Sequence, residues 1–193
     1  MPIQVDLTER RAAIADATVR VAAREGLQAV TIRSVASELG ASTTVITNYL
    51  PTRTALLVNA LQQIESTWLE ELEAELVGDN PRDALRRAMR VAVDWDADEL
   101  LRFQFWIAVL AVPDRDAEVD RHLVDSTAAM RELFSKLVDH CGHPQATIAA
   151  DMLVLVAQGA FVSIVETPRE WSRERMMVTA DAAVDAVLAG STT

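Results

Sequence analysis

The 193-residue sequence has little of several residue types, and each shortage narrows the class of protein. Its one cysteine, Cys141, can form neither an internal disulfide nor a cysteine zinc cluster, so the chain makes no demand for an oxidising compartment. Six glycines, six prolines and 5% aromatic residues argue against a collagen-like or low-complexity chain and favour helices. We therefore expect a helical globular protein of one domain, or of a small module fused to a larger one.

No segment has the pattern of a signal peptide or of a membrane span. Acidic residues precede the first apolar stretch at the N-terminus, whereas a secretory signal has basic and then apolar residues. The longest uncharged stretches, such as 103–112 and 152–165, are shorter than the roughly 20 residues that cross a bilayer. We expect a soluble, cytoplasmic protein that has no membrane partner.

Common catalytic patterns are also missing. The chain has no G-x-G-x-x-G, P-loop, G-x-S-x-G or H-E-x-x-H pattern, so we expect no enzyme activity and no cofactor. The histidines His122, His140 and His143 are separated by 18 and 3 residues, which does not place two ligands on one helical face, and we expect no metal site. Cys141 has no neighbouring lysine or arginine to activate its thiol, which is typical of an inert cysteine.

Charge is distributed unevenly along the chain. The net charge is −11, yet residues 1–57 carry six arginines and five acidic residues, a net of +1, which leaves −12 for the rest. Electric fields decay over about 8–10 Å in physiological salt, so the local charge matters more than the total. Only the N-terminal part of the chain is suited to approach a nucleic acid.

Apolar residues recur at helical spacing throughout the chain. Ile14, Ala17 and Val21 share one face of the first expected helix, which should end at Gly26. No strand-type alternation is sustained over a useful length. The pattern predicts nine helices and no sheet, at 8–25, 32–39, 43–49, 53–76, 82–95, 98–112, 117–140, 146–166 and 172–188.

Residues 31–50, TIRSVASELGASTTVITNYL, carry the clearest functional signal. Two short helices flank a turn at Gly40, Ala36 is small where the helices cross, and Ile46 fills the space between them, which is the packing of a helix-turn-helix. The exposed face of the second helix has short polar side chains suited to phosphates and base edges, namely Thr43, Thr44, Thr47 and Asn48. On this segment alone, an ordinary helical hairpin with polar residues facing water is an equal alternative.

The order of segments around this motif resembles the tetracycline-repressor (TetR) family of bacterial transcription regulators. An amphipathic helix ending in Gly26 is followed by T-I-R-S-V-A-S-E-L-G and then S-T-T-V-I-T-N-Y-L-P-T-R-T-A-L-L. The resemblance is strongest over 8–57. It implies an all-α, nine-helix fold, with a helix-turn-helix DNA-binding domain at 1–52 and a helical ligand-binding and dimerisation domain at 53–193. The function implied is a ligand-responsive repressor released from a palindromic DNA operator.

The same resemblance assigns the residues that would contact double-stranded DNA. It places some at the start of the support helix, some facing the major groove and some beside phosphates, in the order Thr31, Arg33, Ser42, Thr43, Thr44, Thr47, Asn48, Tyr49 and Arg53. Thr47 stands where the family more often has tyrosine, and Arg53 where it usually has lysine. Since the candidate contacts are polar, operator binding should depend on salt.

The stretch 100–112 is similar to the choline-responsive betaine-repressor group of the family. Residues that could line an effector cavity, each with core packing as the alternative, are Trp95, Phe103, Trp106, Met130, Phe134, Met152 and Phe161. A cation over a tryptophan face is stabilised by about 0.5–2 kcal/mol, and the acids Asp94, Asp96, Asp98 and Glu99 lie near Trp95 in sequence. We expect a small hydrophobic effector, with a cationic one as the further option.

Small and apolar residues form long stripes on the last two expected helices. The resemblance implies that these helices pair with a second copy, and the candidate interface residues are Leu153, Val156, Ala157, Ala160, Ile164, Ala183 and Val187. A homodimer would give one short reading helix two half-sites. Two other functions stay open: a helical adaptor in which 31–50 is merely structural, and a helical-bundle enzyme or cofactor carrier.

Overall fold

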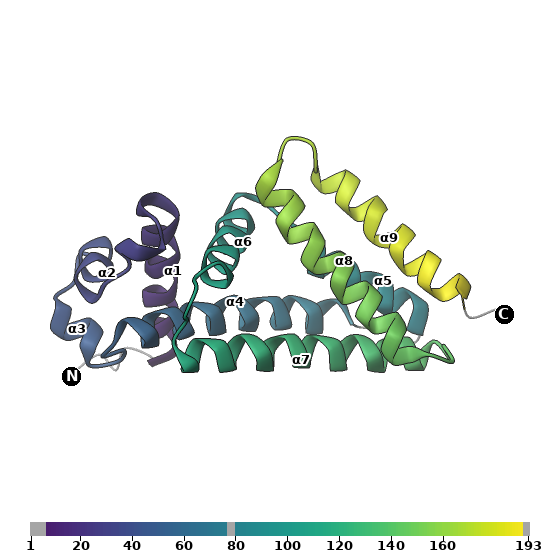
Figure 1. The fold of residues 1–193 in the computed structure, drawn as a ribbon, viewed down its shortest axis with the longest axis horizontal. Helices are drawn as coiled ribbons and strands as arrows, with labels where there is room; N and C mark the ends of the chain where they lie inside the picture. Colours follow the sequence, from purple (N-terminus) through teal and green to yellow (C-terminus); the bar gives the residue numbers. More distant parts are fainter. Residues whose placement is uncertain (1–6, 77–79, 191–193) are drawn as a thin grey trace. The chain divides into compact units, whose positions relative to one another are not determined.

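The computed structural model describes residues 7–76 and 80–190, which are helical almost throughout (Figure 1). The elements are α1 (Leu7–Glu25), η1 (Leu27–Ala29), α2 (Ile32–Glu38), α3 (Thr43–Thr47), α4 (Arg53–Glu75), α5 (Pro81–Val93), α6 (Ala97–Leu110), α7 (Ala117–His140), α8 (Ala146–Glu166) and α9 (Arg173–Ala189). These residues form nine α-helices, one short 3₁₀ turn and no strand. The prediction of an all-α, nine-helix fold is confirmed.

Helix ends follow local chemistry. Gly26 ends α1 with a φ of 87°, a left-handed conformation that a side chain would disfavour. Asn80 caps α5 by accepting hydrogen bonds from the backbone of Arg82 and Asp83, and Pro81 occupies the first helical position, where its missing N–H costs nothing. The 3₁₀ turn η1 was not predicted, because three residues are too few for a periodic pattern.

The chain packs as two compact units. The first unit comprises Met1–Ser66 and Gln104–Leu123, and the second comprises Thr67–Phe103 and Val124–Thr193. Helices α4, α6 and α7 therefore contribute residues to both units. This division by packing differs from the boundary expected near residue 52. The assignment of DNA binding to 1–52 and of ligand binding and dimerisation to 53–193 stays a prediction.

The first unit has a core built on α1. Its predicted face is buried completely, with Ile14, Ala17 and Val21 at 0% exposure. Helix α1 packs against η1 and α2, and α2 packs against α3. Leu56 and Leu61 from the start of α4 are also buried, since each lies on the apolar side of that helix. The short elements η1, α2 and α3 thus lie in the chain between two long helices, α1 and α4, which both bury apolar residues in this unit.

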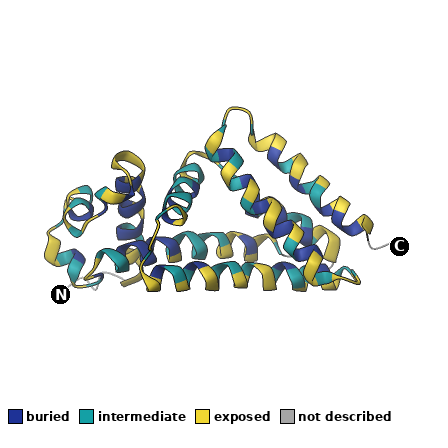
Figure 2. Ribbon diagram, in the orientation of Figure 1, coloured by how far each residue is buried: buried dark blue, intermediate teal, exposed yellow. Residues whose placement is uncertain are grey.

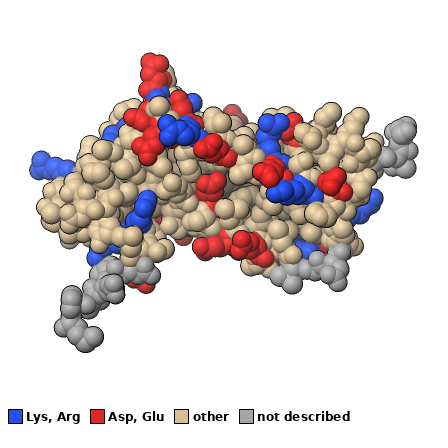
Figure 3. Space-filling model, turned by 90° about the horizontal axis from the view of Figure 1, so that it is seen from below, with Lys and Arg blue, Asp and Glu red and all other residues tan. Residues whose placement is uncertain are grey.

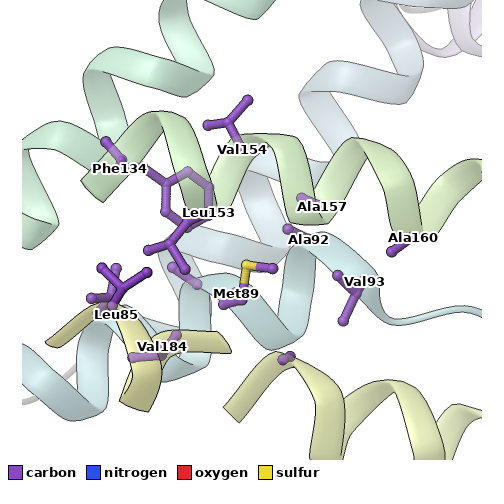
Figure 4. Close-up of a cluster of buried hydrophobic side chains, with 14 of the residues drawn as sticks. Leu85, Met89, Ala92, Val93, Phe134, Leu153, Val154, Ala157, Ala160 and Val184 are labelled. Atoms are coloured by element: carbon purple, nitrogen blue, oxygen red, sulfur yellow. The ribbon is translucent and has the colours of Figure 1, made fainter. Parts of the chain in front are cut away.

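The second unit has a larger core in which α5 packs against α8 and α9, and α8 packs against α9 (Figure 4). Its helices are buried along one side and exposed along the other, as the alternating colours of Figure 2 show. Ion pairs join α5 to α9 beside this core: Arg90 Nε donates to Asp181 at 2.8 Å, and Arg86 pairs with Asp185. Partly exposed ion pairs of this kind contribute little stability, so apolar burial holds the unit together.

Helix α8 is the one helix among the described residues that is long and apolar enough to cross a membrane. Its buried side lies in the core of the second unit, and 39% of its most apolar stretch is buried there. Core burial explains that part of the composition, so the helix is weak evidence for a membrane span. The predicted cytoplasmic location stays a prediction.

Candidate nucleic-acid interface

The segment predicted as a helix-turn-helix forms two short helices with capped N-termini. The hydroxyl of Thr31 accepts from the backbone N–H of Ser34 at 3.0 Å, and the hydroxyl of Ser34 accepts from the backbone N–H of Thr31 at 2.9 Å. This reciprocal box begins α2 with serine in the place usually taken by glutamate. Ser42 begins α3 in the same way by accepting from the N–H of Val45 at 3.4 Å. Thr31 and Ser42, predicted as DNA contacts, therefore also position the two helices.

A left-handed glycine and a small buried cluster set the angle between these helices. Gly40 has a φ of 61°, which lets the chain turn within a few residues. Ile46 is 0% exposed, and Val35 and Ala36 of α2 are buried with it. The predicted roles of Gly40, Ala36 and Ile46 agree with these positions. The result is a rigid support for the exposed side of α3.

The exposed side of α3 consists of short polar side chains. Ser42, Thr43, Thr44 and Asn48 are exposed, whereas Thr47 and Tyr49 are half-buried. The hydroxyl of Thr47 donates to the carbonyl of Thr44 at 3.3 Å, which holds it close to its own helix. Hydroxyls and amides of this size donate and accept hydrogen bonds at base edges and phosphates. The prediction that these residues contact DNA stays a prediction.

Two arginines of the first unit form ion pairs with one carboxylate. Glu38 of α2 accepts from Arg24 Nη1 at 2.8 Å and from Arg20 Nε at 2.9 Å. These bonds, that of Arg24 first, hold the pKa of Glu38 below its usual range. Glu25 and then Glu38 raise the pKa of Arg24 in return. The two arginines tie α1 to α2 and are correspondingly less available to a phosphate.

Arg33 and Arg53, both predicted as DNA contacts, differ in their surroundings. Arg33 on α2 is exposed, and among the described residues it has no ion-pair partner. Arg53 instead donates from Nε to the carbonyl of Val30 at 3.0 Å and from Nη2 to the carbonyl of Leu27 at 2.9 Å. The structure therefore engages Arg53 with the backbone between α1 and α2, a contact that sequence analysis did not foresee.

Charged side chains elsewhere are mixed in sign. On the face drawn in Figure 3, blue atoms lie singly or beside red ones, and the described residues form no continuous basic patch there. The net charge of −11 is consistent with this view. This face therefore offers a polyanion no continuous basic surface.

Five of the seven residues predicted to line an effector cavity lie in or against one core of the second unit, namely Trp95, Phe103, Met130, Phe134 and Phe161. Phe103 and Phe161 stack in the second unit with ring centroids 4.5 Å apart, and Met130 packs beside that core. Phe134 is 0% exposed and fills the core, which was the alternative considered for each residue. Trp106 belongs to the first unit. That these residues line an effector cavity stays a prediction.

Met152 departs from the cavity prediction, and Trp95 makes a structural hydrogen bond. Met152 is 52% exposed because it lies on the outer side of α8. Trp95 donates its indole N–H to the carbonyl of Trp171 at 3.0 Å, which ties the chain after α5 to the chain before α9. Arg175 lies over the ring of Trp171 with its guanidinium carbon 4.1 Å from the centroid. Trp95 and Trp171 thus act in holding the second unit together.

Three of the four acids near Trp95 have partners within the chain. Asp94 pairs with Arg173, and Glu99 pairs with Arg102. Asp96 accepts from the backbone of Glu99 and of Asp98 at the start of α6, and these bonds lower its pKa. Burial raises the pKa of Glu99 despite Arg102. Since these carboxylates are occupied, they give little support to the idea of an acidic wall for a cationic effector.

Most of the predicted interface residues of α8 and α9 are buried in the core of the chain itself. Leu153, Ala157 and Ala160 point toward α5 in Figure 4, and Leu153 is 0% exposed. Ile164 and Val187 are buried in the same core, Ala183 is partly buried against it, and Val156 is the exposed member of the set. The correction has a simple cause: a helix with apolar residues on both sides gives no sequence signal for which side faces the core.

The outer side of α8 carries an apolar stripe in which Val156 is the one member that the sequence predicted as part of the interface. It consists of Ile148, Met152, Leu155, Val156 and Val162, all exposed. Gly159 lies in the same stripe and has nothing within 4 Å of the position of a Cβ atom. Val178 on α9 is also exposed. The spacing of four, three and seven residues along α8 indicates this stripe, but most of the interface residues were predicted on the opposite side of the helix.

The histidines and the cysteine lie apart. His122 of α7 lies 3.5 Å from a carboxylate oxygen of Glu65 in α4, whereas His140 and His143 are bonded near the end of α7. Within residues 7–76 and 80–190, no three histidine, cysteine or acidic residues are grouped to hold a metal ion. Burial raises the pKa of the Cys141 thiol, which lowers the fraction of reactive thiolate.

Comparison with models of protein families finds no match. A search of curated proteins finds the HTH-type transcriptional regulator PksA of Bacillus subtilis (strain 168), 27% identical over 112 residues. The matched part is 58% of this chain and 55% of that protein, so the chain spans about half the length of this relative.

Solved structures match over nearly the whole chain. A transcriptional regulator from Rhodococcus sp. Rha1 has a TM-score of 0.84 and 21% identity over 95% of this chain and 98% of that one. A TetR transcription regulator from Haloarcula marismortui has a TM-score of 0.80 and 17% identity, over 93% and 98% of the two chains. A regulator from Saccharomonospora viridis, crystallised with choline, has a TM-score of 0.77 and 21% identity over 92% and 96%. The TetR-like fold implied by the sequence resemblance is confirmed.

Proposed function

We infer that this chain, which has the fold of the TetR-type transcriptional regulators, is itself a DNA-binding transcriptional regulator of that type. The observation that carries the proposal is the capped, glycine-turned α2–α3 pair, whose outer side exposes threonine, serine and asparagine. The sequence likeness to the HTH-type regulator PksA supports it independently of the fold. A regulator is favoured over the helical adaptor and the helical-bundle enzyme, because structures of this fold matched here are described as regulators.

Specific binding by a reading helix of five residues needs a second copy. Helix α3 spans Thr43–Thr47, which is long enough to reach only a few base pairs. A two-fold dimer would place two such helices on a palindromic operator. The exposed apolar stripe of α8 supports this assembly, since exposed side chains such as Leu155 and Ile148 are stabilised by burial against a partner.

The effector is a small, largely apolar molecule that binds in the second unit and lowers operator affinity. Phe103 and Phe161 provide a stacked aromatic surface, with Met130 and Trp68 packed beside the same core. The Saccharomonospora regulator was crystallised with choline, and a quaternary ammonium is held by aromatic faces without a carboxylate. Choline is therefore the first probe. Release of the operator requires that the effector binds one state of the dimer more tightly than the other.

A selection experiment tests the proposal. The wild-type chain is mixed with random-sequence DNA duplexes, and the bound duplexes are amplified, sequenced and re-tested by gel shift at two salt concentrations. We expect a palindromic sequence bound more tightly than its scrambled form. A double variant, Thr43→Ala with Asn48→Ala, should lose this preference while it keeps its helical content. Failure of the wild-type chain to select any sequence would contradict the proposal.

A further inference from the structure

The guanidinium of Arg53 binds the backbone that joins α1 to α2. Arg53 is the first residue of α4, and its Nε and Nη2 atoms donate to the carbonyls of Val30 at 3.0 Å and of Leu27 at 2.9 Å. Both carbonyls belong to the turn around η1. Two hydrogen bonds from one planar guanidinium hold it in a fixed orientation. A flexible cation on the surface has no such fixed orientation.

The turn that Arg53 binds has few bonds of its own. Within it, the N–H of Ala29 donates to Gly26 at 3.0 Å, and the N–H of Val30 donates to Leu27 at 3.2 Å. A three-residue 3₁₀ turn has poorer hydrogen-bond geometry than an α-helix, so bonds from outside matter more for its position. The hydroxyl of Ser34 supplies another such bond to the carbonyl of Ala29 at 2.8 Å. The turn is therefore held between α2 and the start of α4.

A second connection joins α4 to α1. The buried amide of Asn59, 4% exposed, donates to the carbonyl of Arg11 at 2.9 Å and accepts from Arg11 Nε at the same distance. Because both polar ends of the amide are satisfied by one residue, the register between the two helices is specified. Arg53 and Asn59 together tie the start of α4 to the α1–α2 turn and to α1.

We propose that Arg53 is a positioning residue, which holds the α1–α2 turn and thereby aims α3, and that it is not a phosphate ligand. The proposal rests on the DNA-binding function inferred above and differs from the phosphate contact that the family resemblance implies for this position. The bonds to Val30 and Leu27 use the Nε–Nη2 edge of the guanidinium, so this edge cannot bind a phosphate through two parallel hydrogen bonds.

The two roles of Arg53 lead to different DNA-binding behaviour. A phosphate contact strengthens binding to every sequence and adds about one unit to the slope of log affinity against log salt. A positioning contact acts through the base-reading helix, so its loss weakens the selected sequence and leaves the scrambled one unchanged. Lysine keeps the charge and would replace a phosphate contact, but its single nitrogen does not reproduce the planar fork.

The test compares Arg53→Lys and Arg53→Gln with Arg33→Gln, an exposed control on α2. Each is titrated with the duplex selected by the wild-type chain and with its scrambled form, over a range of salt. We expect both Arg53 variants to bind the selected duplex about tenfold more weakly, with the scrambled duplex and the salt slope unchanged. Arg33→Gln should weaken both duplexes and reduce the slope by about one. Wild-type affinity in Arg53→Lys, with a reduced slope in Arg53→Gln, would overturn the proposal.

A measurement without DNA separates this proposal from the proposed function. The backbone amides of Ala29 and Val30 are followed by hydrogen exchange in the wild-type chain and in the three variants. Exchange should be faster in both Arg53 variants and unchanged in Arg33→Gln. Unchanged exchange in Arg53→Lys and Arg53→Gln would overturn the positioning role even if DNA is bound. If the wild-type chain selects no duplex, the proposed function fails, and the exchange rates still decide whether Arg53 holds the turn.

Discussion

The two units expose opposite kinds of surface, polar around α3 and apolar along α8. Around α3 in the first unit, the exposed residues are short and polar, such as Thr43 and Asn48. Along α8 in the second unit, they are large and apolar, such as Ile148 and Leu155. A surface of short donors and acceptors can exchange water for base edges and phosphates, whereas an apolar stripe is stabilised by contact with another protein surface. The difference agrees with our proposal that the first unit reads DNA and that the second unit forms the dimer.

The units also use polar groups differently. In the first unit, Thr31 and Ser42 accept the hydrogen bonds that begin α2 and α3, and Arg53 donates hydrogen bonds that hold a turn. In the second unit, ion pairs such as Arg90 with Asp181 lie beside a large apolar core and contribute little to its stability. Substitutions of polar residues should therefore alter the first unit more than the second, and substitutions of apolar residues the reverse.

The largest expected effect separates the inner and outer sides of α8. Leu153→Ala removes a fully buried side chain and should lower the free energy of unfolding by about 2–5 kcal/mol. Met152→Ala, one residue away on the exposed side, should change it by less than about 0.5 kcal/mol when the chain is monomeric. Urea unfolding at low protein concentration measures both. Equal losses in the two variants would remove the distinction between the sides.

The next prediction concerns assembly through the outer side. Leu155→Asp places a charge in the exposed stripe, so we expect monomers in analytical ultracentrifugation and an operator affinity at least about 100-fold weaker, because the link between half-sites is lost. Val124→Asp on α7 is the matched control, since both side chains are 67% exposed. A wild-type chain that sediments as a monomer at micromolar concentration would contradict the interface.

A smaller effect is expected on the reading helix. Asn48→Ala and Thr47→Ala should each lower operator affinity by about 1–3 kcal/mol if their side chains contact base edges. Thr179→Ala, an exposed threonine of α9, should have no such effect. Competition titrations with the selected duplex measure the differences. Unchanged affinity in both α3 variants, with the fold intact, would leave the first unit without a reading surface.

The smallest effect concerns pH and the ion pairs of Glu38. Its pKa is lowered in the folded chain, so the carboxylate stabilises the fold above its ordinary pKa of 4.5, and this stabilisation is lost as the pH falls through the lowered value. Glu38→Gln should therefore flatten the decline of thermal stability from about pH 5 downward. Glu9→Gln, at an exposed position of α1, serves as the control. An unchanged pH profile in Glu38→Gln would show that its bonds to Arg20 and Arg24 do not persist in solution.

The helices and the reading motif were predictable because their causes are local. Gly26 and Gly40 adopt left-handed conformations that a sequence can indicate, and Thr31 and Ser42 cap helices that begin at the predicted residues 32 and 43. The face of α1 defined by Ile14, Ala17 and Val21 is buried as its spacing indicates, because polar residues occupy the opposite face. Local hydrogen bonding and one-sided apolar spacing are properties of short segments, so they can be read without the fold.

Long-range geometry decided what the sequence left open. Spacing alone did not indicate that Leu153 faces α5 and Leu155 faces outward, since both sides of α8 are apolar and only packing against neighbours distinguishes them. Nor did it indicate that Arg53 would bind carbonyls at Leu27 and Val30, because the contact spans more than 20 residues. The sequence thus determined the helices to within about two residues at each end, and it predicted the helix-turn-helix pair. The tertiary structure decided which apolar side is buried and which charges are occupied, because both depend on segments far apart in the chain.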